Sequence, residues 1–225
     1  MIKLENYEVV GWEHAIRGMR NPKNSWDRMD SLTCTGCKGC NPGDECNRYK
    51  NGTFIGPNDH KLMMALAKGG PVHAKYRRMI TVYVDITAPL YWWKEFDTYK
   101  IGTVANSCST MHKLTYKEFE VSDFSTEKLT EASKKYLCDL IMYMNQMRAC
   151  YEAAINPEYK ETYWHQMIQL LPTSYNQKRT VMLNYEVLAN IYKSRKNHKL
   201  DEWRKLCEWI EGLPYSEIIT GIEKE

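Results

Sequence analysis

The sequence lacks the features that mark membrane, exported and nucleic-acid-binding proteins. No apolar run approaches the roughly 20 residues that a helix needs to cross a bilayer. The first ten residues, MIKLENYEVV, contain no apolar signal core, so we expect no export. The net charge is only +3 and no block of Lys or Arg stands out. We therefore expect a cytoplasmic protein without nucleic-acid or membrane partners.

Internal repeats and low-complexity linkers are also missing, while residues that build a core are plentiful. Apolar residues make up 43% of the 225 residues, and seven Trp and sixteen Tyr add large packing area. This length and composition are typical of one compact domain with a substantial core. We expect a single domain over residues 1–225, with an irregular Cys-rich insert at about 30–57.

The first half of the chain alternates between strand and helix signals. Residues 2–10 favour an edge strand, and residues 13–20 favour a short helix. Pro57 opens a second helix, which ends at a pair of glycines and a proline after residue 68. Residues 79–87 alternate as a strand does, and the following Pro89 ends its ladder.

The second half is predicted to be helical. Five apolar residues recur at helical spacing, and such a stripe is far more often core than a cofactor site: Leu137, Leu140, Ile141, Met144 and Met147. Further helices are expected from Pro157 to Leu171, around Leu183–Tyr192, and over residues 200–211. The expected fold is mixed α/β, a small sheet with flanking helices and a helical C-terminal half.

Four cysteines in the insert have a spacing that suits a metal. Cys34, Cys37, Cys40 and Cys46 form C-x2-C-x2-C-x5-C on a Gly-rich segment. Each C-x2-C lets two thiolates converge on one ion, which favours a structural zinc site. An iron–sulfur cluster is the alternative, and free or disulfide-linked cysteines are a third interpretation. His60 is a conceivable substitute ligand.

The cysteines outside the insert carry weaker signals. Cys138, Cys150 and Cys207 fall in predicted helices, where we expect core positions. Cys108 lies in a polar loop. A thiolate there could act as a nucleophile, but nothing nearby in the sequence lowers its pKa, so we expect a packed thiol. His112 is either a proton carrier or a surface residue.

One segment, Ile80–Leu114, has an order of features that few folds need. A β-branched strand ends at Ala88-Pro89, an aromatic helix-like segment follows, and a run of small polar residues ends at Lys113-Leu114. Nine residues after the proline stands the triplet Thr98-Tyr99-Lys100. The triplet Ile101-Gly102-Thr103 comes next.

A second pattern lies late in the chain. Leu171-Pro172 is followed after twelve residues by Asn184, after six more by Asn190, and after five more by Arg195. Eleven residues are about three helical turns, so we expect Asn184 and Arg195 to share a helix face, with Asn190 a little off that line. An amide offers a donor and an acceptor, and a guanidinium is a planar fork of donors. The alternative interpretation is an ordinary polar helix face.

Together these patterns resemble the flavin-dependent thymidylate synthases, in the family's order and over most of the chain. His73, after Gly69-Gly70, stands where the family has a Gly-His. The N-terminal Ala15–Arg20 resembles the family's Ala-Val-Arg-Ala-Ala-Arg. Each motif is loose by itself, and the inference rests on their common order.

The resemblance implies a role for each matched residue. Asn184 and Asn190 would contact the flavin ring. Thr98, Tyr99, Lys100 and Thr103 would take the remaining cofactor-binding positions. Arg195 would hold and polarise the pyrimidine base, with Asn106 and Ser109 also on the substrate. His73 would lie over the active site, and Cys108 or Ser109 would take the place of a loop Ser.

The chain also departs from the family at several cationic positions. The family's phosphate-binding Arg-His-Arg is Thr98-Tyr99-Lys100 here, which removes two forked cations. By ungapped counting, the Arg that grips the nucleotide phosphate becomes Thr110, a loop Glu becomes Asn106, and a basic residue before Leu171 becomes Ile168.

The implied activity is methylation at C5 of a uracil nucleotide, dUMP to dTMP, with FAD, NADPH and methylenetetrahydrofolate. No cysteine nucleophile is needed when Arg195 polarises the base. The resemblance also implies a homotetramer with sites between subunits. Two alternatives remain open. One is a non-catalytic nucleotide-binding or interaction protein on the same scaffold. The other is a metal-dependent protein centred on the Cys-rich insert.

Overall fold

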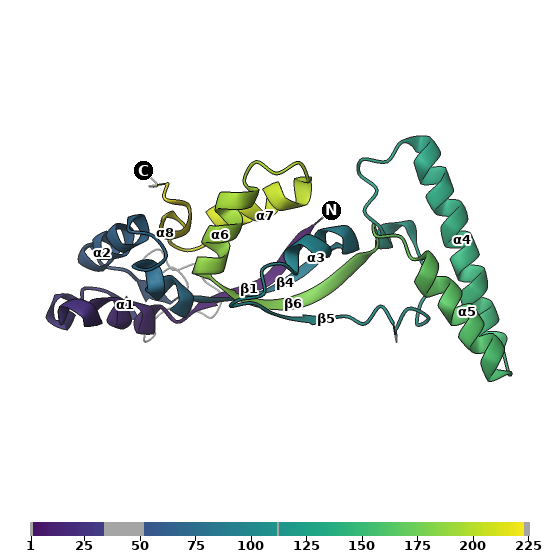
Figure 1. Cartoon of the computed structure of the whole chain (residues 1–225), viewed down its shortest axis with the longest axis horizontal. Helices are drawn as coiled ribbons and strands as arrows, with labels where there is room; N and C mark the ends of the chain where they lie inside the picture. The colour runs from purple at the N-terminus through teal and green to yellow at the C-terminus, as the bar shows by residue number, and fades with distance from the viewer. Residues whose placement is uncertain (1, 34–51, 112, 223–225) are drawn as a thin grey trace, which may run out of the picture. The chain divides into compact units, whose positions relative to one another are not determined.

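The computed structural model describes residues 2–33, 52–111 and 113–222 (Figure 1). Its main sheet has four strands. The strand order is β1-β4-β6-β5, with β1 at an edge as predicted. The bounds are Lys3–Val10 for β1, Thr81–Pro89 for β4, Asn176–Asn184 for β6 and Val104–Ser107 for β5. The mixed α/β fold expected from the sequence is therefore confirmed.

Two short strands flank the Cys-rich segment. β2 (Leu32–Thr33) and β3 (Thr53–Phe54) pair antiparallel, with Leu32 opposite Phe54. The Tyr215 hydroxyl accepts a hydrogen bond from the Ile55 amide at 3.0 Å, next to this pair. Cys34, Cys37, Cys40 and Cys46 lie outside the described residues, as does His112.

The chain divides into two compact units, whose boundaries fall within β1, β4, β5 and β6 and between Thr98 and Tyr99. The hairpin unit comprises mainly Asp85–Thr98 and Ala105–Thr180. The α6 unit comprises the described residues of Leu4–Val84, Tyr99–Val104 and Val181–Glu225.

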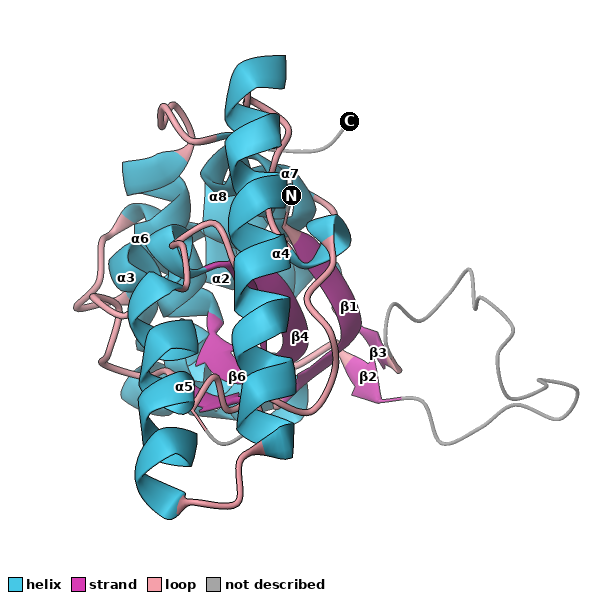
Figure 2. Ribbon diagram, turned by 90° about the vertical axis from the view of Figure 1, so that its right-hand side faces the viewer, coloured by secondary structure: helices cyan, strands magenta, loops and turns pink. Residues whose placement is uncertain are grey.

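The hairpin unit is named after α4 (Glu131–Ala153) and α5 (Pro157–Leu170), which lie side by side (Figure 2). Thr130 and Asn156 cap their N-termini, each accepting a hydrogen bond from a first-turn amide. The predicted apolar stripe of α4 is confirmed as core: Leu137, Ile141 and Met144 are buried, and Leu140 and Met147 pack against them.

A second element of this unit is the aromatic helix α3 (Leu90–Phe96), which the segment after Pro89 predicted. Trp92, Trp93 and Phe96 are all buried on it. The indole of Trp93 donates to the Gln177 carbonyl at 3.0 Å, and the Arg179 guanidinium lies 4.1 Å from its ring centroid. The short helix is thereby fixed against β6.

The α6 unit contains the other long helices. These are α1 (Trp12–Arg20), α2 (Pro57–Lys68), α6 (Tyr185–Arg195), α7 (Asp201–Glu211) and the short α8 (Glu217–Thr220). Its buried core includes at least one large side chain from each of them: Trp12, Ile16, Met63, Ile191, Trp203, Leu206, Ile210 and Ile218. Short 3-10 helices occupy Asn21–Lys23, Trp26–Arg28, Ala74–Met79 (η3) and, in the hairpin unit, Val121–Asp123.

One structural prediction for the late part of the chain was wrong. Leu183 and Asn184 were expected on a helix, but Asn176–Asn184 is strand β6, and α6 begins only at Tyr185. Leu183, Val187, Leu188 and Ile191 recur at helical spacing across the boundary, which hid the alternation within β6. Asn184 therefore does not share a helix face with Arg195.

The predictions for cysteines outside the insert were partly wrong. Cys207 is buried as expected, and burial raises its pKa to about 11. Cys138 is exposed and Cys150 is half-buried, because both lie off the buried stripe of α4. Cys108 is exposed rather than packed. In the described part of the chain, no helix is long and apolar enough to span a membrane.

A buried carboxylate fixes the chain next to β2. Asp59, with no exposed surface, accepts from Arg20 Nε at 2.6 Å, from the Ser31 hydroxyl at 2.7 Å and from the amides of Asp30 and Ser31. Burial raises the pKa of Asp59. The hydrogen bonds from Ser31 and Asp30 and the charge of Arg20 outweigh burial, so the net effect is a lowered pKa.

Removal of this carboxylate should destabilise the protein strongly. We expect Asp59→Ala to lower the free energy of unfolding by about 3–5 kcal/mol, because it leaves the buried Arg20 without its counter-charge. Urea denaturation measures the change. The control Asp27→Ala removes an exposed carboxylate and should stay within about 0.5 kcal/mol. A loss for Asp59→Ala no larger than the control's would contradict this role.

The same carboxylate predicts an acid limit of stability. Its pKa in the folded state lies below the ordinary value of 3.8, so its contribution is complete above that value. As the pH falls through the folded pKa, the contribution disappears. We expect the stability difference between wild type and Asp59→Asn to be constant at neutral pH and to shrink below about pH 4. Urea midpoints at several pH values test this.

Candidate functional site

The α6 unit contains a cavity of about 370 Å³ at the N-terminal half of α6. We call it the asparagine cavity, because both predicted flavin-contacting amides border it. Its lining residues come from η3, the loop before it, the loop before β5 and α6: Pro71, Arg78, Ile101, Gly102, Asn184, Glu186, Val187 and Asn190. The sequence therefore placed Asn184 and Asn190 at one site, although it misjudged the element that carries Asn184.

Asn184 is the N-cap of α6, and capping fixes the orientation of its amide. Its Oδ1 accepts from the backbone amides of Glu186 at 3.1 Å and Val187 at 3.0 Å. With the oxygen used in this way, Nδ2 must point to the other side, and it has no hydrogen-bond partner among the described residues. Asn184 thus offers the cavity a pre-oriented N–H donor.

Gly102 lies directly against that donor. Its φ is +79°, and a Cβ built on it would lie 2.7 Å from Asn184 Nδ2. A side chain at this position would strain the backbone and displace the amide. Glycine therefore keeps space beside the donor, which the sequence did not signal because an isolated glycine in a loop is common.

Glu186, which lines the cavity, forms a charged pair with Arg77 of η3. Glu186, only 7% exposed, lies in the first turn of α6, and its Oε2 is 3.6 Å from Arg77 Nη1. At that distance the contact is an ion pair rather than a hydrogen bond. Glu186 Oε2 and Arg77 Nε are both buried without a hydrogen-bond partner. Buried polar atoms are usually satisfied, so an unpaired carboxylate oxygen on a residue that lines a cavity favours a ligand site.

Two further groups next to this site are polar and buried. Thr103 Oγ1, beside Gly102 in the sequence, is buried without a hydrogen-bond partner. Tyr76, beside Arg77, donates its hydroxyl proton to the Met63 carbonyl at 2.9 Å. Burial raises the pKa of Tyr76 to about 12, so its hydroxyl stays neutral and supports η3 at physiological pH.

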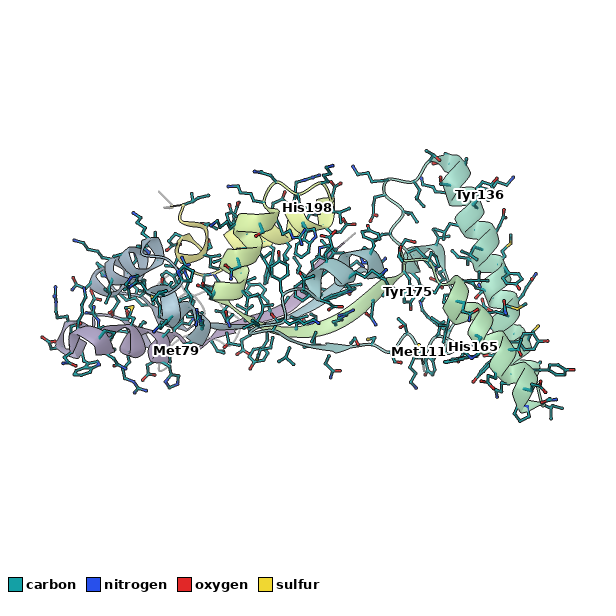
Figure 3. All side chains as sticks on the ribbon, in the orientation of Figure 1. Met79, Met111, Tyr136, His165, Tyr175 and His198 are labelled. Atoms are coloured by element: carbon teal, nitrogen blue, oxygen red, sulfur yellow. The ribbon has the colours of Figure 1, made fainter. Side chains whose placement is uncertain are left out.

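Arg195 does not line the asparagine cavity. It is the last residue of α6, and its Nε donates to the Tyr99 hydroxyl at 3.0 Å. Its guanidinium lies 4.6 Å from the Trp203 ring centroid and 3.0 Å from Nε2 of His198, which Figure 3 marks. Tyr99 and Trp203 thus orient the plane of the guanidinium.

Two other predicted residues of the α6 unit also lie outside the lining. His73 is exposed and precedes η3, with its ring against Gly69, where a Cβ would come within 3.1 Å of it. Lys100 is exposed, and its carbonyl accepts from the Thr103 amide. In the sequence, Pro71 is the residue nearest to His73 that lines the cavity.

The remaining predicted residues belong to the hairpin unit. Thr98 donates its hydroxyl proton to the Glu95 carbonyl at 2.7 Å, at the end of α3. Asn106 is exposed on β5, and Cys108 follows it. The Ser109 hydroxyl accepts from the Met111 amide at 3.2 Å.

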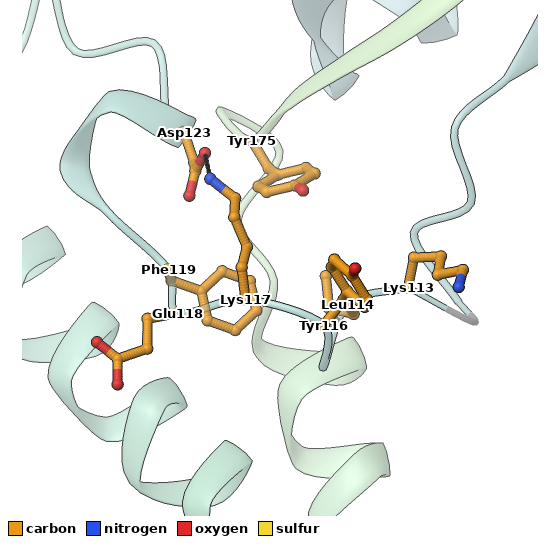
Figure 4. A pocket seen from close by; sticks show the side chains of 8 residues that line it. All are labelled: Lys113, Leu114, Tyr116, Lys117, Glu118, Phe119, Asp123 and Tyr175. Atoms are coloured by element: carbon orange, nitrogen blue, oxygen red, sulfur yellow. Dashed lines mark hydrogen bonds and ion pairs between the residues drawn. The ribbon is translucent and has the colours of Figure 1, made fainter.

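The hairpin unit has a cavity of its own, of about 280 Å³ (Figure 4). Its apolar floor includes Leu114 and Phe119, each 5% exposed. Lys117 extends to Asp123 at 2.6 Å, a hydrogen bond that raises the pKa of Lys117. Asp123 and Glu118 line this cavity, and each already pairs with a cation. The cavity therefore has fewer polar groups available to a ligand than the asparagine cavity.

Solved structures of a flavin-dependent thymidylate synthase and of a nucleotide methylase match this chain. The flavin-dependent thymidylate synthase ThyX from Helicobacter pylori, complexed with FAD and dUMP, matches with a TM-score of 0.61 and 16% identity over 99% of both chains. A second structure of that enzyme with FAD and dUMP matches with a TM-score of 0.60, covering 96% of this chain and 94% of the other. The chain has the fold of the flavin-dependent thymidylate synthases.

A third match is a nucleotide methylase. The UMP/dUMP methylase PolB from Streptomyces cacaoi, bound with 5-Br dUMP, has a TM-score of 0.57 and 11% identity over 99% of this chain and 95% of that one. No protein-family model matches the sequence, and no curated protein does either. The fold is thus shared, while the sequence is far from those of its structural neighbours.

Several residues of the site were missed by sequence reasoning. Arg78, Gly102, Glu186 and Val187 border the cavity without having been predicted. A capping signal was present, because Asn184 is followed two residues later by an acidic residue. Among the described residues, no group of His, Cys, Asp or Glu could hold a metal, so the zinc prediction remains confined to the Cys-rich segment.

Two substitutions separate the structural from the binding role of Asn184. We expect Asn184→Ala to lower the free energy of unfolding by about 0.5–2 kcal/mol, because α6 loses its cap. Asn184→Asp should cost less than about 0.5 kcal/mol, because a carboxylate oxygen caps as well, although the N–H donor is gone. Urea denaturation of both variants measures the two losses in free energy of unfolding. Equal losses would show that Asn184 does not cap α6 in solution.

Proposed function

We propose that this chain is a flavin-dependent methyltransferase acting at C5 of a uracil nucleotide, converting dUMP to dTMP. The observation that carries the proposal is the asparagine cavity, which is lined by a fixed amide donor on Asn184 and by Glu186, a buried carboxylate with one unpaired oxygen. Support comes from neighbours of the same fold that were crystallised with FAD and dUMP or with 5-Br dUMP.

The residues around the cavity fit an isoalloxazine ring. Its pyrimidine edge carries two carbonyl oxygens and one N–H, and the cavity offers donors on Asn184 and Arg78 and an acceptor on Glu186. Gly102 and Val187 leave a surface against which a flat ring can lie. Asn190 extends the row of amides along α6. When bound, a flavin would supply the redox chemistry, with NADPH and methylenetetrahydrofolate as co-substrates.

The remaining residues have proposed roles around the base. Arg195 polarises a pyrimidine carbonyl, since its plane is already oriented by Tyr99 and Trp203. His73 excludes water above the site, and Ser109 or Cys108 of the polar loop contacts the nucleotide. Because these residues belong to different parts of the chain, the proposal includes a homotetramer in which neighbouring copies complete each site.

A non-catalytic nucleotide-binding protein is the second candidate. It is favoured by the triplet Thr98-Tyr99-Lys100, where two of the three side chains are engaged within the chain. Thr98 bonds to the Glu95 carbonyl, and Tyr99 bonds to Arg195. Of the three, only Lys100 offers a cation to a diphosphate.

Flavin binding and proton release from C5 test the proposal. We expect the purified protein to bind FAD, seen as a shifted flavin absorption spectrum. With NADPH and methylenetetrahydrofolate it should release tritium from [5-³H]dUMP. Asn184→Asp should weaken FAD binding at least tenfold, because the fixed donor is replaced by an anion. The control Lys193→Gln changes an exposed residue of α6 and should leave both readouts unchanged.

Three outcomes distinguish the two candidates. Binding of FAD together with tritium release supports the methyltransferase. Binding of dUMP without tritium release, under any of these conditions, favours the non-catalytic candidate. Protein that binds neither FAD nor dUMP contradicts both.

A further inference from the structure

The polar residues that line the asparagine cavity supply both hydrogen-bond donors and an acceptor. Arg78 and the Nδ2 of Asn184 are donors, Glu186 is a carboxylate acceptor, and Asn190 offers one of each. A cyclic imide, with a ring N–H between two carbonyl groups, presents the complementary set of acceptor, donor and acceptor. Flavins and uracil nucleotides share this edge.

The carboxylate is the distinctive member of that set. Glu186 is more than nine-tenths buried yet borders the cavity, and its Oε2 has no hydrogen-bond partner among the described residues. Leaving a buried carboxylate without hydrogen bonds is costly, which favours a ligand that supplies the missing donor. Asn184, which also lines the cavity, has only a donor to offer because capping occupies its oxygen.

Arg77 explains how such a carboxylate is tolerated. It approaches Oε2 of Glu186 to 3.6 Å from η3, and its own Nε is buried and unpaired. The pair keeps Glu186 turned toward η3 while one face of the residue borders the cavity. A loose ion pair of this kind compensates the charge and leaves hydrogen-bonding capacity for a ligand.

We propose that Glu186 accepts a hydrogen bond from the imide N–H of the ligand and thereby selects rings whose imide nitrogen is unsubstituted. The proposal rests on the proposed function, since it takes the asparagine cavity as the ring-binding site. It adds a specificity-determining residue that the sequence did not mark. A hydrogen bond to a charged group is strong, and a methyl group on the nitrogen both removes the donor and meets the carboxylate.

N3-methylated ligands test this inference without reference to turnover. We expect wild-type protein to bind FAD at least tenfold more tightly than N3-methyl-FAD if the flavin ring occupies the cavity. If the uracil ring occupies it, dUMP should be preferred over N3-methyl-dUMP by the same factor. Equilibrium dialysis of both pairs identifies which ring uses Glu186.

Two variants and one control make the test specific. Glu186→Gln should reduce the discrimination several-fold, because a neutral acceptor replaces a charged one. The double variant Arg77→Met/Glu186→Ala removes the acceptor, the steric conflict and the orphaned cation together, so the two ligands of a pair should bind within twofold of each other. Glu208→Gln, at an exposed position of α7, should discriminate as wild type does.

The outcomes separate this inference from the proposed function. Discrimination that disappears in the double variant supports Glu186 as the acceptor. Discrimination that is absent in wild type, or unchanged in the double variant, overturns it even where FAD and dUMP bind and tritium is released. Wild-type protein that binds neither ligand overturns the inference and the proposed function together. Circular dichroism confirms that each variant is folded.

Discussion

The hydrogen bonds that Asn184 accepts at the start of α6 are the constraint on which the site depends. One side-chain oxygen satisfies two backbone amides that would otherwise lack partners, and so ends β6 and begins α6 at a defined residue. Because these bonds hold Oδ1 in place, the side-chain nitrogen Nδ2 of Asn184 can point in only one direction. Gly102 occupies that direction with a backbone and no side chain. A secondary-structure boundary thus produces a directed donor at a cavity wall.

The α6 unit contains two buried ion pairs that differ in how completely their atoms are hydrogen-bonded. Asp59 and Arg20 are buried with a short hydrogen bond, and the carboxylate has further donors, so this pair is a structural anchor. Glu186 and Arg77 are nearly as buried, but they lie farther apart and keep unpaired atoms. Leaving buried polar atoms without hydrogen bonds costs stability. The contrast distinguishes a structural ion pair from one that a ligand can complete.

Sequence reasoning succeeded where one local pattern dominated. The stripe on α4, the helix that Pro57 opens and the strand that ends near Pro89 were all predicted, because each follows from a single periodicity or a proline. It failed at β6, where helical spacing of apolar residues runs across the junction with α6. It also placed Cys138 in the core, although neighbouring positions on one helix differ in burial by their angle to the stripe.

The sequence by itself determined the fold class and most of the helices, because these follow from periodicity and turn residues, and spacing along the chain pointed to the amides of Asn184 and Asn190. Only the tertiary structure decided that Glu186, Arg78 and Gly102 join those amides at one cavity, while Arg195 packs on Trp203 instead. The reason is physical. Contacts between segments far apart in sequence decide which polar groups converge and which of them remain unpaired. These contacts cannot be read from spacing along the chain.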